Sequence, residues 1–296
     1  MFPIIPANSV AEEAGNQEGI FGFGNDGSMC DITNLVSNAG VVASDVTGVG
    51  TARDAPAACE FGGDKGIIGY GYIEWIEVSM TNLVSNTGVV ASDVAGVGTV
   101  RRLLGACSYG GDKGIFGFGQ PAHDMTNLVS NTGVVASDTA GVGTARTSLA
   151  ACEFGGDRGI FGYGHDGSTV SYTNLVSNTG VVASDVAGVG TARYNLAACG
   201  YGEDKGIFGF GTDNASTTNL VSNTGVVSSD VAGVGTVRGA LGATQYDVDK
   251  GIFGYGKQAS TSYSITNLVS NTGVVASDQA ATTGTARRYL TACSFN

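Results

Sequence analysis

Residues 19–24, GIFGFG, decide the fold, because closely similar stretches return five more times along the 296-residue chain. The later copies begin at Gly66, Gly114, Gly159, Gly206 and Gly251. Successive copies lie 47, 48, 45, 47 and 45 residues apart. Repeats of roughly 40–50 residues are typical of a β-propeller, in which each repeat forms one antiparallel blade. We therefore expect six such units.

Two further markers repeat with the same period. The segment TNLVSN begins at Thr33, Thr81, Thr126, Thr173, Thr218 and Thr266. Each copy precedes a Val-Val run that ends in Ser-Asp, and an Arg then opens a small-residue segment such as RTSLAACEF at residues 146–154. The turns between these segments are rich in Gly, Asp and Asn, which supply the positive φ angles of tight hairpins. The repeat predicts four antiparallel strands per blade, with the small-residue segment innermost, where the blades converge.

The two ends of the chain predict how the ring closes. The first repeat begins at the second strand of a blade, whereas the chain finishes on a lone first strand, YLTACSF at residues 289–295. The C-terminal strand completes a blade if it pairs with the N-terminal strands, which also removes open sheet edges. The sequence therefore predicts an all-β, six-bladed propeller over residues 18–296, preceded by an extended arm at residues 1–17.

Composition argues against two kinds of partner. The formal net charge is −12, which disfavours binding to a phosphate backbone. The chain has no run of eighteen apolar residues, and residues 1–17 lack the basic start and long apolar core of a secretion signal. We expect no nucleic-acid partner, no membrane insertion and no signal peptide.

The cysteines follow the repeat. Five of the six occupy one repeat position, where the remaining unit carries Thr244: Cys59, Cys107, Cys152, Cys199 and Cys293. Equivalent positions in successive blades should lie too far apart for disulfide geometry. We expect small buried thiols that Thr can replace, and not a disulfide framework.

These repeats resemble two groups of known sequences. An Arg before the inner strand, a glycine-rich hairpin and a following strand such as GIFGFG at residues 206–211 resemble the kelch pattern over about residues 18–296. The chain departs from that pattern because no copy carries the closing Trp, and the single Trp of the chain is Trp75. The repeats also resemble kelch-like sequences of phage and environmental viral proteins.

The repeats differ from one another at two places. One is the loop after GIFGFG, and the other is the position after the repeat Arg. Because connections alternate between the faces of a propeller, both places are expected on one face, where loops on a rigid scaffold can bind a partner. The alternative is that these loops are merely unconstrained. The candidate binding residues are Tyr72, Ile73, Trp75, Ile76, His123, His165, Tyr194 and Tyr289. The apolar members near Trp75 form either a contact surface or a loop that folds back on its blade.

No catalytic, metal or cofactor site is expected. The two histidines lie in different units, and no Cys or His pair has the spacing of metal ligands. Recurrent Asp residues at the end of the fourth segment favour turn formation over a calcium ring: Asp45, Asp93, Asp138, Asp185, Asp230 and Asp278. Recurrent Arg residues either tie neighbouring blades together or form a substrate-binding ring: Arg53, Arg101, Arg146, Arg193, Arg238 and Arg287.

The viral resemblance leads to the functional hypothesis. We expect a non-enzymatic structural and interaction module of a virus particle, such as a phage tail, fibre or capsid decoration. Phe2, Ile4 and Ile5 in the arm would insert into a neighbouring virion protein, unless the arm is simply disordered. The varied face would bind another virion protein or a host surface glycan. The alternative is a soluble lectin-like propeller that binds glycans.

Overall fold

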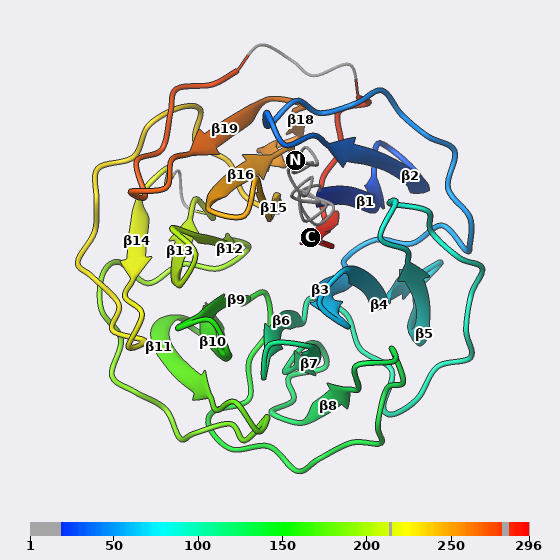
Figure 1. The fold of residues 1–296 in the computed structure, drawn as a ribbon, viewed down its shortest axis with the longest axis horizontal. Coiled ribbons are helices and arrows are strands. Elements are labelled where there is room, and N and C mark those ends of the chain that lie inside the picture. The colour runs from blue at the N-terminus through cyan, green and yellow to red at the C-terminus, as the bar shows by residue number, and fades with distance from the viewer. Residues whose placement is uncertain (1–18, 213–214, 280–283, 296) are drawn as a thin grey trace, which may run out of the picture.

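The computed structural model describes residues 19–212, 215–279 and 284–295, and no helix occurs among them. Six three-stranded antiparallel sheets and one two-stranded hairpin make up the fold. Figure 1 shows the sheets placed around a common centre, with β3, β6, β9, β12 and β15 nearest to it. This all-β arrangement is consistent with a propeller-like fold. The predicted arm, with Phe2, Ile4 and Ile5, lies outside the described residues.

The three strands of each sheet follow one another from the centre outward. The first three sheets are β20 (Thr291–Ser294), β1 (Gly19–Asn25) and β2 (Met29–Val36); β3 (Ala57–Phe61), β4 (Lys65–Ile73) and β5 (Ile76–Val84); and β6 (Gly105–Tyr109), β7 (Lys113–Gly117) and β8 (Thr126–Val129). The other three are β9 (Ala150–Phe154), β10 (Arg158–His165) and β11 (Thr169–Val176); β12 (Ala197–Tyr201), β13 (Lys205–Gly209) and β14 (Thr218–Val221); and β15 (Gly242–Tyr246), β16 (Lys250–Gly254) and β19 (Thr266–Val269). The hairpin pairs β17 (Lys257–Gln258) with β18 (Thr261–Ser262).

The small-residue segments lie innermost, as the sequence predicts. The strands β3, β6, β9, β12, β15 and β20 each contact the next in this order, and β20 also contacts β3. The last strand, β20, pairs antiparallel with β1, from Gly19 opposite Ser294 to Gly22 opposite Thr291. The two ends of the described chain therefore share one sheet.

Glycine is needed where adjacent sheets approach each other most closely. A Cβ atom placed on Gly66 of β4 would lie 2.7 Å from the Sγ atom of Cys293 in the neighbouring sheet. The same contact recurs between Gly114 and the Sγ atom of Cys59, at 2.5 Å. All six cysteines are free and buried, which confirms the expected small buried thiols. Glycine on one sheet thus makes room for a thiol on the next.

The expected fourth strand is not a regular strand. In the first unit the segment after Val36 makes two isolated bridges, Val36 with Val42 and Thr33 with Val46. The register shifts by one residue between these bridges, so no continuous ladder forms. The Asn34 side chain fills the gap, because its Nδ2 atom donates to the Ala43 carbonyl at 3.0 Å. The outermost segment is therefore held partly by a side-chain amide.

The recurrent arginines are buried connectors. Arg146 is 0% exposed, and its guanidinium donates to the carbonyls of Tyr163 and Thr144 and to Oδ1 of Asn174. It also lies 4.2 Å from the ring centroid of Phe118, which belongs to the preceding unit. All six repeat arginines are 0–1% exposed, so a substrate-binding ring is ruled out at these positions. The prediction that they tie neighbouring units together is confirmed, because each guanidinium lies over a ring of the preceding unit and each main-chain carbonyl accepts a hydrogen bond from a glycine of that unit, as Arg146 does from the N–H of Gly119 at 3.0 Å. Their side-chain hydrogen bonds stay within their own unit.

The recurrent aspartates act with these arginines. Asp185 accepts hydrogen bonds from the main-chain N–H and the hydroxyl of Thr144, at 3.0 and 2.7 Å, and from Asn174 at 2.9 Å. Burial raises the pKa of Asp185, but the hydrogen bonds from Thr144 and Asn174 outweigh it and leave the pKa below its usual value. Asp185 thereby fixes the linker that leads into β9, the inner strand of its own sheet. This contact supports a structural role for the recurrent aspartates.

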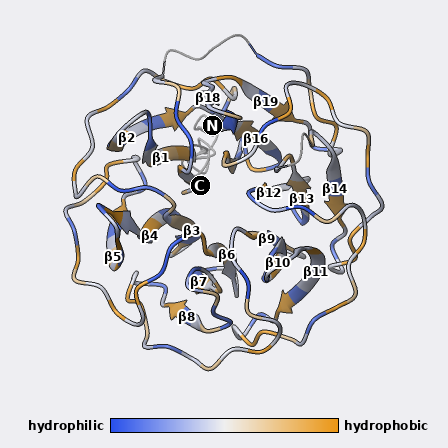
Figure 2. Cartoon of the chain, turned by 180° about the vertical axis from the view of Figure 1, so that it is seen from behind, coloured by the Kyte–Doolittle hydropathy of each residue, from blue (hydrophilic) through white to orange (hydrophobic). Residues whose placement is uncertain are grey.

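The outer rim exposes apolar side chains. One valine per unit, in the turn after TNLVSN, is 63–66% exposed: Val41, Val89, Val134, Val181, Val226 and Val274. Figure 2 shows apolar and polar stretches alternating along this outermost segment. The rim is thus the part of the described surface where exposed side chains barely vary between units.

Candidate functional site

The two varied places lie side by side on one face. Main-chain bridges or hydrogen bonds join the residue after GIFGFG to the residue after the repeat Arg. The pairs are Asn25 with Arg288, Tyr72 with Asp54, Gln120 with Arg102, His165 with Thr147, Thr212 with Tyr194, and Lys257 with Gly239. The prediction that both varied places share one face is therefore confirmed at these positions. We call this surface the varied face.

A closed cycle of main-chain hydrogen bonds surrounds the centre of the varied face. One residue per unit takes part, each with φ between 52° and 56°: Ala55, Leu103, Ser148, Asn195, Ala240 and Tyr289. The N–H of each donates to the carbonyl of the preceding member at 2.8–3.1 Å, and Ala55 donates to Tyr289. A left-handed backbone at a non-glycine residue costs on the order of 1–3 kcal/mol, so the surrounding contacts must hold it. We call these six residues the mouth cycle.

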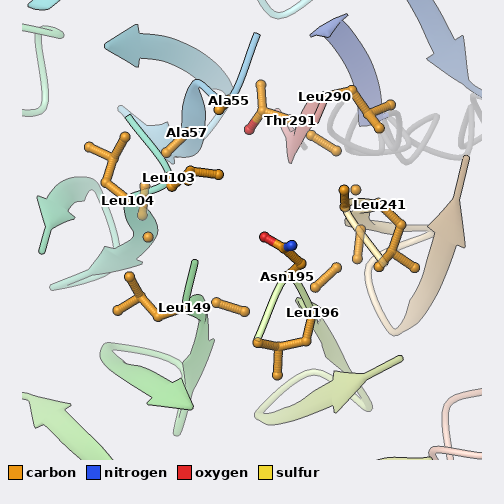
Figure 3. Close-up of a pocket in the computed structure, with 18 of the residues that line it drawn as sticks. Ala55, Ala57, Leu103, Leu104, Leu149, Asn195, Leu196, Leu241, Leu290 and Thr291 are labelled. Atoms are coloured by element: carbon orange, nitrogen blue, oxygen red, sulfur yellow. The ribbon is translucent and has the colours of Figure 1, made fainter. Parts of the chain in front are cut away.

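The mouth cycle opens into a central cavity of about 110 Å³. Leucines and alanines of the inner strands line most of it, and Figure 3 shows Asn195 pointing toward its middle. Five of its six leucines are only 5–6% exposed, and Leu103 of the mouth cycle is half-buried. Most lining side chains are therefore apolar, and the polar ones are Ser148, Asn195 and Tyr289 of the mouth cycle and Thr291 of β20.

The hairpin between β4 and β5 projects an aromatic side chain from the varied face. Glu74 and Trp75 form its two-residue turn with φ of 41° and 77°, the positive values that a type I′ hairpin requires. Trp75 is 88% exposed and Ile76 is 66% exposed, whereas Tyr72 and Ile73 are half-buried. Trp75 and Ile76 do not fold back on their own sheet, so the contact-surface interpretation applies to these two residues.

The other predicted residues are only partly gathered. The rings of His165 and Tyr194 meet edge to face with centroids 5.5 Å apart, across neighbouring units. Tyr289 belongs to the mouth cycle. Among the described contacts, His123 pairs through its main chain with Gly119 and Arg146 and joins no other candidate. The eight candidates therefore form a dispersed surface and not one site.

Sequence reasoning missed the cations beside these aromatic rings. The guanidinium of Arg102 lies 3.9 Å from the ring centroid of Tyr72, and the Nζ atom of Lys257 lies 4.8 Å from that of Tyr289. A signal for Lys257 was present, because every other lysine directly follows an Asp. In the Asp-Lys sequence the two side chains form an ion pair in the hairpin turn. Lys257 follows Gly256 instead, so the sequence alone shows that it lacks this neighbour.

The opposite end of the central channel is acidic. Glu60 on β3 and Glu153 on β9 line a cavity of about 300 Å³ together with Gln245. Ser294 donates a hydrogen bond to Oε2 of Glu60 at 2.8 Å. Burial is the main cause that raises the pKa of each glutamate to about 7; for Glu60 the hydrogen bond from Ser294 opposes the rise and the charge of Glu153 adds to it. The equivalent positions in the other four units carry Ser108, Gly200, Gln245 and Ser294. The two acids therefore do not recur with the repeat, and the sequence analysis did not single them out.

These glutamates make stability depend on pH. Because their folded-state pKa exceeds the unfolded value, the stability they contribute is complete below pH about 4.5 and is lost as pH rises through about 7. We expect the melting temperature to fall between pH about 5 and about 8, and the double variant E60Q/E153Q to lose that fall. Thermal unfolding followed by fluorescence across this range tests it, and equal slopes in both proteins would refute the assignment.

Other chemistry on the described residues is limited. No three His, Cys, Asp or Glu side chains of the described ranges are grouped to hold a metal ion. Burial raises the pKa of the Cys59 and Cys199 thiols to about 12, which keeps them protonated and poorly nucleophilic at neutral pH. No helix in the described part of the chain is long and apolar enough to cross a membrane.

Comparison with the models of known protein families and with the curated proteins finds no match for the chain. The features that bear on function are therefore the varied face, the β4–β5 hairpin and the cavities.

Proposed function

We propose that the chain is a six-bladed, kelch-like β-propeller closed by its C-terminal strand, with three regular strands and one irregular outer strand in each blade. The cyclic contacts of the inner strands and the pairing of β20 with β1 support this architecture. Closure of the ring would leave each blade paired on both sides and would hold the varied face as one rigid platform.

We further propose that this platform is a non-enzymatic interaction module of a virus particle that binds another macromolecule through the varied face. The observation that carries the proposal is Trp75, 88% exposed at the tip of the β4–β5 hairpin. A large aromatic side chain held in water by a tight turn loses little conformational freedom on binding, and Trp is frequent among the residues that dominate interfaces. Ile76 beside it extends the apolar contact.

A lectin with six equivalent sites fits the varied face less well. Two of the bridged pairs are alike, Asn25 with Arg288 and Gln120 with Arg102. The other four differ, from Asp54 with Tyr72 to Gly239 with Lys257. Equivalent glycan sites would need similar side chains at similar positions, because avidity arises from repeated binding of one ligand. Because the side chains at these positions differ between most units, they fit a single partner that covers several units better than six copies of one ligand.

Replacement of Trp75 by Ala tests the interaction. Purified chain is mixed with virus-sized particles from the source culture, and the bound fraction is measured by quantitative mass spectrometry after sedimentation. We expect native protein in the particles at a fixed ratio to capsid protein, and at least tenfold weaker binding by W75A, since a central aromatic anchor is worth about 2 kcal/mol or more.

The matched control is V89A, which removes an exposed side chain of the same unit at the outer rim. Its binding should equal that of the wild type. A chain found wholly in the soluble fraction would contradict the virion proposal, and equal binding by W75A would contradict the role of the hairpin.

A further inference from the structure

A second pocket on the varied face lies away from the Trp75 hairpin. It has a volume of about 230 Å³ and is lined by Tyr194, Thr212, Gly239, Lys257 and Gln258 among others. This is smaller than the roughly 300–1,000 Å³ of pockets for drug-sized ligands, and it matches a ligand of one small ring. The pocket therefore has the size of a monosaccharide site.

Gly239 lines the pocket and places no side chain in it. The other units carry Asp54, Arg102, Thr147, Tyr194 and Arg288 at this position. A Cβ atom on Gly239 would lie 3.2 Å from the main chain of Gly211 and Thr212, which form part of the pocket wall. The φ of Gly239 is not positive, so the backbone does not require glycine here. The missing side chain leaves room for a ligand.

Lys257 gives the pocket a positive charge without a described acidic partner. The other four lysines each lie within 4 Å of an aspartate: Lys65, Lys113, Lys205 and Lys250. Among the described ion pairs Lys257 has none, and its Nζ atom instead faces the ring of Tyr289. Lys257 is half-buried and lines the pocket, whereas Tyr289 does not line it. Rotation of the long lysine side chain away from the Tyr289 ring would bring its ammonium to an anionic ligand in the pocket.

The remaining walls combine an aromatic face with polar groups. Tyr194 is half-buried, and its ring is positioned by the edge-to-face contact with His165. Thr212 donates its hydroxyl proton to the Tyr194 carbonyl at 2.9 Å, so its oxygen remains an acceptor. Gln258 contributes an amide whose Nε2 atom can donate, while its Oε1 atom accepts from the Tyr263 hydroxyl at 3.4 Å. An aromatic ring packs against the C–H face of a sugar, while hydroxyl and amide groups bind its hydroxyls.

We propose that this pocket binds an acidic monosaccharide, with the carboxylate at Lys257, the C–H face of the sugar on Tyr194, and its hydroxyls at Thr212 and Gln258. The site occurs once on the varied face, because only this unit combines Gly at the bridged position with a lysine opposite. The ligand is either a free sugar acid or the terminal residue of a glycan.

Titration of labelled protein with glucuronic acid, monitored by NMR, tests whether binding requires the negative charge of the ligand. Glucose, which lacks the carboxylate, is the control ligand. We expect glucuronic acid to shift a small set of resonances with millimolar affinity and glucose to bind at least tenfold more weakly. K257M should lose at least tenfold in affinity, whereas K250M, which removes a lysine paired with Asp247, should bind normally. Equal binding of both sugars, or of K257M and the wild type, would overturn the proposal.

A further variant completes the test. Y194A should weaken both sugars, because it removes the packing surface and not the charge.

The source of the sugar is distinguished by a glycan array. Preference for glycans that end in a sugar acid over the free acid would place the ligand on a glycan, and equal affinity would make the free acid sufficient. W75A should bind glucuronic acid normally, so failure of this site and failure of the proposed hairpin interaction are separable.

Discussion

Replacement of Arg146 by Ala is expected to lower the free energy of unfolding by about 3–5 kcal/mol. The side chain is fully buried, and its loss leaves the Tyr163 and Thr144 carbonyls and the Asn174 amide oxygen without their donor. It also leaves Asp185 without the positive charge whose nitrogen lies 3.8 Å away. Urea unfolding followed by tyrosine fluorescence measures the change.

The matched control lies in the same unit. Arg158 is exposed and pairs only with the adjacent Asp157 among its described ion pairs, so R158A should change the free energy of unfolding by less than about 1 kcal/mol. R146K should recover little, because an ammonium cannot reach several acceptors in the fixed geometry of the guanidinium. Equal stability of R146A and R158A would show that the buried hydrogen bonds contribute nothing net.

Replacement of Gly66 by Ala is expected to cost about 1–3 kcal/mol, because the new methyl group would overlap the Sγ atom of Cys293. The φ of Gly66 suits alanine, so the cost comes from packing and not from the backbone. Cys293 lies on β20 and Gly66 on the next sheet, so this contact also reports on the junction formed by the last strand.

A double-mutant cycle separates this contact from general damage. Removing the thiol should relieve the overlap, so G66A/C293A should lie within about 1 kcal/mol of C293A alone. C59A should not relieve G66A, because the Sγ atom of Cys59 faces Gly114. Purely additive effects in the G66A/C293A cycle would show that the two sheets do not pack as described. Chemical unfolding of the four proteins gives the coupling energy.

The regular part of the fold was accessible from the sequence because the repeat exposes it six times. Period, turn residues and small-residue segments predicted the inner three strands of each unit and the pairing partners of the ends. The fourth strand was not predicted correctly as a regular element, since the bulge near Ala43 and the amide of Asn34 replace part of its ladder. Where a side-chain amide replaces main-chain hydrogen bonds, the strand no longer shows the alternating pattern that a sequence analysis can detect.

The candidate site was less accessible than the fold. Position within the repeat placed Tyr72, His165 and Tyr194 on one face, because main-chain topology fixes the face of a loop. It could not show that Tyr194 and His165 meet, or that Gly239 leaves a pocket, since both depend on contacts between neighbouring units. The buried state of the arginines was also hidden, because their acceptors are mainly carbonyl oxygens.

The place of the chain ends has a mechanical consequence. Gly19 and Ser294 face each other at the same end of the β1–β20 ladder, so force applied through both ends of the described chain peels the two strands apart one residue pair at a time. Peeling of β20 also pulls Tyr289 out of the mouth cycle, which then opens at Ala55 and Ala240. Load applied across the face is instead shared by all six members of that cycle. The protein should therefore resist pressure on its face and yield easily to traction on its ends.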